Sequence, residues 1–279
     1  MPELPEVEMA RRTAARVAVG RRIVGVRCAD DPIVFEGVGA ARMRRALLGR
    51  RVRAVRRHGK HFWFELDGRP WLCVHFGMTG GVHVPGGSSV HLVSSGRRRP
   101  PAVWPPRFWK LHLVLDDGGE LAIADARRLG RVRLRHDPRR EPPISLLGFD
   151  ALRGLPSPRD FRARLQGRTA PIKAVLLDQG FAAGVGNWIA DEVLYQARID
   201  PRRRADSLSA AELARLRDRL RAVVATAVRL RADGDRFPRS WLFHDRWGRQ
   251  AGAVTGRGLS IRHATVGGRT TAWVPAVQK

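Results

Sequence analysis

The chain has 279 residues and a formal net charge of +26, with 52 lysine and arginine residues against 26 aspartate and glutamate residues. This length allows two domains, and so large a basic excess favours a polyanionic partner such as a nucleic acid. The two cysteines, Cys28 and Cys73, lie too far apart in sequence for a CxxC pair, which argues against a disulfide scaffold and a cysteine zinc site. The sequence has no apolar run of transmembrane length and no secretory signal pattern, so we expect an intracellular protein without membrane attachment.

The N-terminal half has the pattern of one helix followed by antiparallel β-structure. Residues 5–18 predict a helix, because Pro5 suits a first helical turn while Glu6 and Glu8 suit its positive end. From about residue 22 to residue 135, apolar and β-branched runs alternate with glycine, aspartate and proline clusters, which is typical of an antiparallel sandwich. The expected strands are 23–27, 61–66, 71–76, 111–115, 120–124 and 132–134. The stretch 84–106, rich in glycine, serine, arginine and proline, is expected to be a long loop.

Helical signals dominate the second half, after a charged, proline-containing stretch at 137–143 that we interpret as a linker. Ser157 and Pro158 form an N-cap and first-turn pair, and further helices are expected at 171–179, 187–196 and 209–232. The glycine-rich tail contains short β-like pieces at 259–261 and 270–274. The sequence therefore predicts an α+β protein, with a helix and β-sandwich domain at 1–136, a helical domain at 144–235 and a β-hairpin at 236–279.

The chain begins MPELPE, and this start has chemical consequences. A small second residue permits removal of the initiator methionine, which leaves Pro2 with a secondary amine. An α-amino group has a pKa of about 8, so part of it is unprotonated at neutral pH and can attack C1′ of a nucleoside to form an iminium. The iminium acidifies the C2′ proton and opens a path to β-elimination. Glu3 and Glu6 are carboxylates close to this amine, suited to donate to a sugar oxygen or to shuttle protons.

A second motif lies between residues 171 and 201, where two short amphipathic helices flank a glycine-rich turn. Gly184 and Gly186 permit backbone conformations closed to other residues and let the chain approach a phosphate. The N-terminus of the following helix attracts a phosphate through its free N–H groups, and Asn187 adds a side-chain donor. Contacts of this kind bind a nucleic-acid backbone without reading its sequence.

These two motifs resemble those of the formamidopyrimidine-DNA glycosylase and endonuclease VIII family, in which the second motif is a helix–two-turn–helix, and the resemblance extends over the whole chain. It implies that Pro2 is the nucleophile, Glu3 a general acid and Glu6 part of the same site. In this family, a lysine in a setting like RHGK holds the phosphate beside the lesion, and that role falls on Lys60. Leu4 fits the formamidopyrimidine branch, because the endonuclease VIII branch has glycine at this position.

The resemblance also assigns DNA contacts to three further segments. In HFGM, Met78 matches the methionine that enters the gap left by the flipped base, where an apolar wedge offsets part of the cost of unstacking. In DARRLG, Arg127 matches the arginine that faces the orphaned base, while Leu129 stands where the family usually has a phenylalanine wedge. In GGRTTAWVP, Arg269 matches a fingertip arginine that grips the phosphate flanking the lesion.

The end of the chain departs from the bacterial family pattern, which has a four-cysteine zinc finger. No cysteine follows Cys73, and Val274 and Val277 stand where the last two cysteines would be. This resembles the zincless finger of plant and fungal members, so we expect apolar packing to hold the hairpin. We predict no metal and no cofactor, since the histidines show no ligand spacing and His58 and His61 fit strand-end polar positions.

The sequence thus predicts a base excision repair enzyme, a bifunctional DNA glycosylase and AP lyase that excises oxidised purines from double-stranded DNA through a Pro2 Schiff base and β,δ-elimination. Formamidopyrimidines are the expected lesions, and 8-oxoguanine stays open. We expect a monomer, located in the bacterial cytoplasm at the nucleoid or in the nucleus of a eukaryote. Three alternatives remain: an endonuclease VIII-like enzyme for oxidised pyrimidines, a catalytically silent relative that binds damaged DNA, and an RNA-binding ribosomal-type protein, which does not explain the N-terminus.

Overall fold

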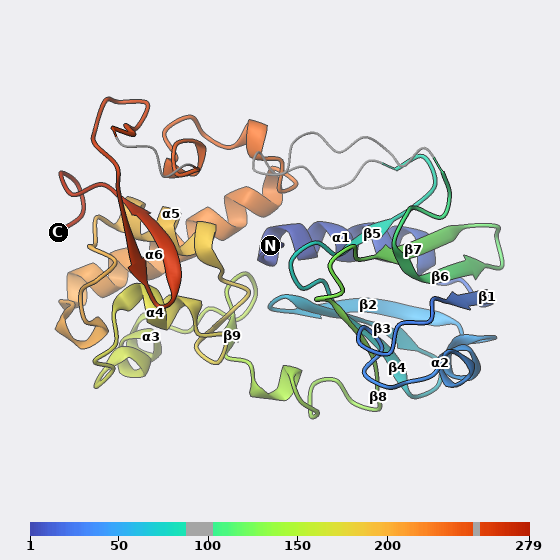
Figure 1. The fold of residues 1–279 in the computed structure, drawn as a ribbon. Helices are drawn as coiled ribbons and strands as arrows, with labels where there is room; N and C mark the ends of the chain where they lie inside the picture. Colours follow the sequence, from blue (N-terminus) through green and yellow to red (C-terminus); the bar gives the residue numbers. More distant parts are fainter. Residues whose placement is uncertain (88–102, 248–251) are drawn as a thin grey trace. The chain divides into compact units, whose positions relative to one another are not determined.

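The computed structural model describes residues 1–87, 103–247 and 252–279 (Figure 1). The loop expected at 84–106 lies mostly outside these residues. The described chain falls into an N-terminal unit that ends at Leu146 and a C-terminal unit that begins at Leu147. Within the described ranges, no helix is both long and apolar enough to cross a membrane.

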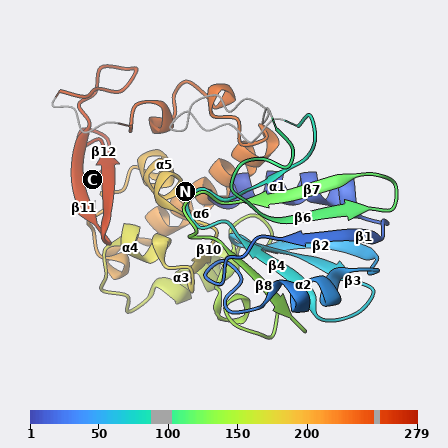
Figure 2. The same cartoon turned by 45° about the vertical axis from the view of Figure 1, so that its right-hand side comes forward.

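The N-terminal unit consists of a leading helix and two antiparallel sheets, as predicted (Figure 2). Helix α1 spans Leu4–Ala18. The first sheet has the strand order β1 (Ile23–Cys28), β6 (Trp109–Leu115), β7 (Glu120–Ala124), β5 (Gly81–His83). The second sheet has the order β2 (Val52–His58), β3 (His61–Leu66), β4 (Trp71–His75), β8 (Arg131–Arg135). Each strand expected from the sequence is present.

Three elements of this unit do not show in the sequence pattern, namely β2, β5 and the helix α2 (Ala40–Leu47). Strand β2 reads VRAVRRH, and its arginines hide the alternation by which Val52 and Val55 are buried. Helix α2 buries only Met43 and Leu47, too few apolar positions to give a helical period. Strand β5 is three residues long and gives no period at all.

Side chains from α1 and from both sheets fill one hydrophobic core. On α1, the core residues follow helical spacing, so one face of the helix lies against the sheets. These residues are Val7, Ala10, Ala14 and Ala18. Phe62 of β3 packs against Phe76, with 5.3 Å between the ring centroids. The shared core holds α1 against the two sheets.

The described part of the C-terminal unit contains helices and a β-hairpin, again as predicted. The helices are α3 (Pro158–Leu165), α4 (Ile172–Leu177), α5 (Asn187–Ala197) and α6 (Ala210–Arg229). The hairpin consists of β11 (Arg262–Val266) and β12 (Arg269–Trp273), and the short strands β9 (Phe149–Asp150) and β10 (Ala182–Ala183) pair in parallel. Ser157 is the predicted N-cap of α3, since its hydroxyl accepts a hydrogen bond from the Asp160 N–H at 3.2 Å.

Two predicted helices are too long at their C-terminal ends. The helix expected at 171–179 ends at Leu177, because the Asp178 carboxylate accepts the Gly180 N–H at 2.8 Å and turns the chain. The helix expected to reach residue 232 ends at Arg229, and Arg231 has a φ of 62°. That left-handed conformation cannot continue an α-helix.

The β-like piece expected at 259–261 contains only an isolated bridge between Ser260 and Val254, and the hairpin strand β11 begins after it, at Arg262. Gly267 and Gly268 form the turn of the hairpin with φ values of 59° and 70°, a conformation that favours glycine. An apolar cluster holds this hairpin, as expected for a finger without cysteines. It comprises Leu242, Ile261, Ala272 and Val274, with Tyr195, Ala253, Leu259 and Val277 packed against it.

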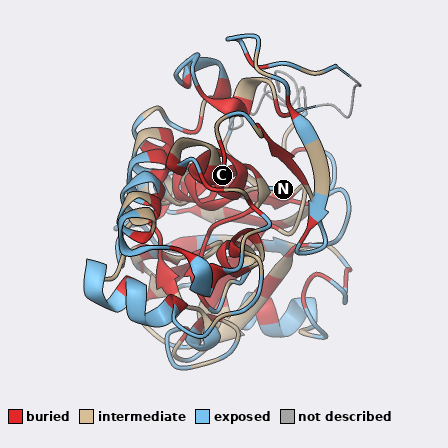
Figure 3. Cartoon of the chain, turned by 90° about the vertical axis from the view of Figure 1, so that its left-hand side faces the viewer, coloured by how far each residue is buried: buried red, intermediate tan, exposed pale blue. Residues whose placement is uncertain are grey.

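A buried ionic cluster also holds the hairpin, and no pattern in the sequence indicates it. Asp191 of α5 pairs with Lys173 of α4 at 2.6 Å and with Arg246 at 2.6 Å. Lys173 also donates to the Thr271 hydroxyl at 2.7 Å, and the Ala272 N–H donates to Asp191 at 3.2 Å. All three charged residues are buried. Figure 3 colours the buried residues of the chain red. Helices α4 and α5 and strand β12 therefore share one set of polar contacts.

Replacing Asp191 with asparagine is expected to lower the free energy of unfolding of the C-terminal unit by about 3–5 kcal/mol, because the buried cations Lys173 and Arg246 would both lose the carboxylate that they bind. Urea unfolding followed by tryptophan fluorescence measures this change. Asp218→Asn on α6 is the control, because the side chain of Asp218 is 72% exposed and such substitutions change stability by only about 0.5 kcal/mol. Equal effects of the two variants would contradict the structural role of Asp191.

Candidate functional site

The start of α1 brings two carboxylates beside the beginning of the chain. Glu3 is the N-cap residue of α1, and its N–H donates to Glu6 Oε2 at 3.2 Å. Both glutamates are buried, with 3% and 4% of their surface exposed, while Pro2 is half-buried and Met1 is exposed. The positive end of the helix favours negative charge at this position. The structure thus brings Pro2, Glu3 and Glu6 together, as the sequence predicts.

Lys60 lies in the two-residue turn between β2 and β3, where His58 pairs with His61 at the strand ends. Gly59 has a φ of 56°, which such a tight hairpin turn requires. Buried Arg57 donates to the Gly59 carbonyl at 2.8 Å and to Glu8 Oε2 at 3.0 Å. Because Glu8 belongs to α1, one guanidinium connects the turn that carries Lys60 to the helix that carries Glu3 and Glu6.

The ionic state of Glu8 follows from this contact. Burial by itself raises the pKa of Glu8, but hydrogen bonds from Arg11 and Arg57 outweigh it and lower the pKa to about 2. Arg11 also donates to the Val55 carbonyl on β2 at 3.1 Å. The carboxylate is therefore ionised throughout the physiological range, and α1 is attached to β2 by two arginines.

The predicted gap-filling residues lie on two loops that contact each other. Met78 is half-buried in the loop after β4, whereas Arg127 and Leu129 are exposed in the loop between β7 and β8. Buried Asp125 joins the loops by accepting the Thr79 hydroxyl at 2.8 Å and the Arg127 N–H at 3.2 Å. The loops approach so closely that a Cβ at position 77 would overlap the backbone of Leu129.

In the C-terminal unit, the structure brings Asn187 close to the hairpin that carries Arg269. Gly186 is the N-cap residue of α5 and Asn187 its first residue, and the glycine-rich turn before them contains Gly184 with a φ of 100°. The Asn187 side-chain amide donates to the Thr270 carbonyl at 2.9 Å. Arg269 is exposed and begins β12 at the hairpin turn. The predicted phosphate-contacting residues of this unit therefore belong to one connected structure.

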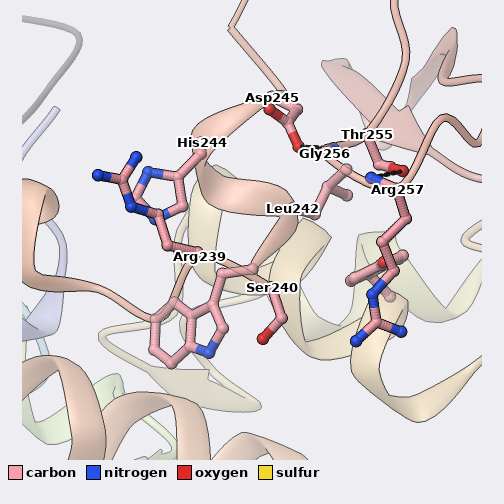
Figure 4. Close-up of a pocket in the computed structure, with 10 residues that line it drawn as sticks. Arg239, Ser240, Leu242, His244, Asp245, Thr255, Gly256 and Arg257 are labelled. Atoms are coloured by element: carbon pink, nitrogen blue, oxygen red, sulfur yellow. Dashed lines mark hydrogen bonds between the residues drawn. The ribbon is translucent and has the colours of Figure 1, made fainter.

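A pocket of about 430 Å³ lies elsewhere in the C-terminal unit (Figure 4). Its lining includes the polar side chains of Arg239, Ser240, His244, Asp245 and Arg257. None of the candidate site residues predicted from the sequence lines it. Within the described ranges, no group of three or more histidine, cysteine, aspartate or glutamate side chains is arranged to hold a metal ion.

Comparison with known proteins agrees with these observations. Residues 1–132 match the formamidopyrimidine-DNA glycosylase N-terminal domain, and residues 147–238 match the formamidopyrimidine-DNA glycosylase H2TH domain. The chain is 41% identical to the formamidopyrimidine-DNA glycosylase of Arabidopsis thaliana over 279 residues, which is 100% of this chain and 71% of that protein.

Solved structures show the same likeness. The MutM (Fpg) protein from Thermus thermophilus is 34% identical, with a TM-score of 0.76, and the match covers 99% of this chain and 98% of that one. A MutM in complex with carbocyclic 8-oxo-G containing DNA is 26% identical, with a TM-score of 0.80 and 100% coverage of both chains.

The helix-led β domain and the H2TH domain together define a DNA glycosylase of base excision repair. The chain belongs to the formamidopyrimidine-DNA glycosylase family, whose members combine glycosylase and AP lyase activities. Its finger without cysteines agrees with the likeness to the plant protein.

Replacing Glu8 with glutamine is expected to make the free energy of unfolding depend less on pH in the acidic range. A carboxylate whose pKa falls from 4.5 to about 2 on folding stabilises the protein above pH 4.5, and this contribution is lost as the pH falls towards 2. Urea unfolding of both proteins between about pH 7 and pH 3 measures the difference. The wild type should lose its advantage over Glu8→Gln as the pH falls, and two parallel profiles would contradict this assignment.

Proposed function

We propose that this protein excises oxidised purines from double-stranded DNA with the amine of Pro2 as its nucleophile. While Met1 is attached, the Pro2 nitrogen is a tertiary amide and cannot react, so the active form lacks Met1. The observation that carries the proposal is the arrangement at the start of α1, where two buried carboxylates adjoin Pro2 and Arg57 connects the Lys60 turn to the same helix.

The proposed reaction begins with the damaged nucleotide flipped out of the duplex, because C1′ cannot be reached within the stack. The Pro2 amine attacks C1′, the glycosidic bond breaks, and the base leaves with a proton. Glu3 donates a proton to the ring oxygen as the sugar opens to the iminium. Loss of the C2′ proton then breaks the 3′ C–O bond, and a second elimination breaks the 5′ C–O bond, leaving a gap with phosphate ends.

The proposed DNA contacts divide between backbone and bases. Lys60, Asn187 and Arg269 contact phosphates, with the Gly186 region offering the N–H groups of a helix start. Met78, Arg127 and Leu129 fill the gap that the flipped nucleotide leaves, since wedge residues offset the cost of unstacking. Their clustering on two joined loops, and the bond between Asn187 and the hairpin, support this division.

We further propose three functional parts, at 1–136, 144–235 and 236–279, in a monomer that acts where the cell keeps its DNA.

Formamidopyrimidines are the proposed main lesions, because the matched relatives are named formamidopyrimidine-DNA glycosylases. Oxidised pyrimidines are the second candidate, favoured by leucine in place of an aromatic wedge at position 129. Pro2, Glu3, Glu6 and Lys60 together argue against a silent DNA-binding relative.

Borohydride trapping tests the nucleophile. Protein confirmed to lack Met1 is incubated with duplexes that contain an abasic site, a formamidopyrimidine, 8-oxoguanine or an oxidised pyrimidine. We expect a covalent adduct with the wild type and none with Pro2→Gly, because borohydride reduces an iminium and the variant lacks the secondary amine. The ranking of the duplexes gives the lesion class. Absence of an adduct on every duplex would leave a DNA-binding relative as the better account.

Replacing Arg269 with glutamine is expected to weaken binding to an abasic-site duplex and to reduce the slope of log Kd against log salt by about 1, because one phosphate contact is lost. Fluorescence anisotropy at several salt concentrations measures both values. Arg262→Gln is a matched control on the same hairpin, since Arg262 is exposed at the end away from the turn. An unchanged slope for Arg269→Gln would remove Arg269 from the interface.

A further inference from the structure

The loop between β7 and β8 is held at a residue whose side chain forms an ion pair with a buried aspartate. Arg128 lies between Arg127 and Leu129 and has a φ of 56°, in the left-handed region that a side chain other than glycine rarely adopts. Its guanidinium donates to Asp31 twice through Nε, at 3.0 and 3.2 Å, and once through Nη2, at 3.1 Å. This ion pair offsets the energetic cost of the left-handed backbone conformation at Arg128.

Asp31 belongs to the segment between β1 and α2 and is 4% exposed. Besides Arg128, it binds Lys110 of β6 at 2.8 Å and accepts the Val34 N–H at 3.2 Å. Burial raises the pKa of Asp31, but hydrogen bonds from Lys110 and Arg128 outweigh it and lower the pKa to about 2. One buried, ionised carboxylate thus joins a sheet strand, the segment before α2 and the exposed loop.

A second buried carboxylate, that of Asp125, also holds the loop between β7 and β8. Asp125 at its start accepts the Arg127 N–H at 3.2 Å and the Gly130 N–H at 2.6 Å. Asp125 therefore fixes the two ends of the loop, and Asp31 fixes its middle through Arg128. Arg128 keeps 48% of its side chain exposed while it binds Asp31. Its neighbours in the chain are Arg127, which is exposed, and Leu129, which is 42% exposed. Those are the two residues of this loop with a proposed role in the opened stack.

We propose that Asp31 is a positioning residue for the base-flipping step, because it holds Arg128 and so presents Arg127 and Leu129 to the DNA in one fixed arrangement. This inference rests on the proposed function. Asp31 touches neither the substrate nor Pro2, so its loss should affect insertion into the stack and leave the iminium chemistry unchanged. A wedge that is ordered before binding avoids the entropy of ordering it at the moment of insertion.

The test compares two substrates that differ in what must be unstacked. A formamidopyrimidine in a duplex must be flipped out, whereas a preformed abasic site has no base to unstack and costs less to expose. Asp31→Asn should slow single-turnover base excision by about tenfold, which is the effect of one charge-assisted hydrogen bond. It should slow strand cleavage at the abasic site by less than about twofold. A 2-aminopurine next to the lesion should show a smaller rise in fluorescence on binding.

Two further variants keep the test sharp. Arg128→Gln removes the same contact from the partly exposed partner, so it should reproduce the selective loss, and the double variant should be no slower than either single variant. Asp30→Asn, the exposed neighbour with the same change of charge, should leave both rates unchanged. Equal losses on both substrates, or no loss on either, would overturn the role of Asp31. Inactivity of the wild type on both substrates would instead refute the proposed function.

Discussion

The ion pair between Glu8 and Arg57 is the contact on which the geometry of the N-terminal unit depends. Both side chains are fully buried, and the arginine uses one nitrogen for the carboxylate of α1 and another for the carbonyl in the turn of β2 and β3. Desolvation offsets much of the attraction between two buried charges, so this ion pair contributes more to the geometry of the unit than to its net stability. The beginning of the chain and the tip of the Lys60 hairpin are held at a fixed separation as a result.

The same arrangement recurs around the other proposed contact residues. Three of these side chains adjoin a backbone group that a buried polar side chain holds in place: Gly59 beside Lys60, Thr270 beside Arg269, and the N–H of Arg127 itself. Arginine and lysine lose much rotamer freedom when they bind, so a fixed backbone limits the further entropy lost. In each case a hydrogen bond from a buried side chain determines the position of the backbone that carries the proposed contact residue.

The sequence predicted much of the fold and located the candidate residues, because the N-terminal motif, the glycine-rich turn and the apolar strands are local patterns. It missed β2, whose arginines mask the buried valines. It also did not indicate β11, which follows the β-like piece at 259–261 and pairs with β12 across the glycine turn. The clusters around Asp31 and Asp191 could not be predicted. Their members lie up to 98 residues apart in sequence, and nothing in the residues near an aspartate shows which distant arginine it will meet.

Oxidants that damage guanine in DNA also attack thiolates, so a finger built on four metal-bound cysteines is exposed to the agent whose products it helps to remove. Here no cysteine follows Cys73, and packing and buried ions hold the hairpin that presents Arg269. The two thiols lie in β1 and β4, where burial raises the pKa of both, that of Cys73 to about 12. They stay protonated and react slowly. The hairpin should therefore keep its shape during the oxidative stress that creates the lesions, because it has no cysteine that oxidation could remove from a metal.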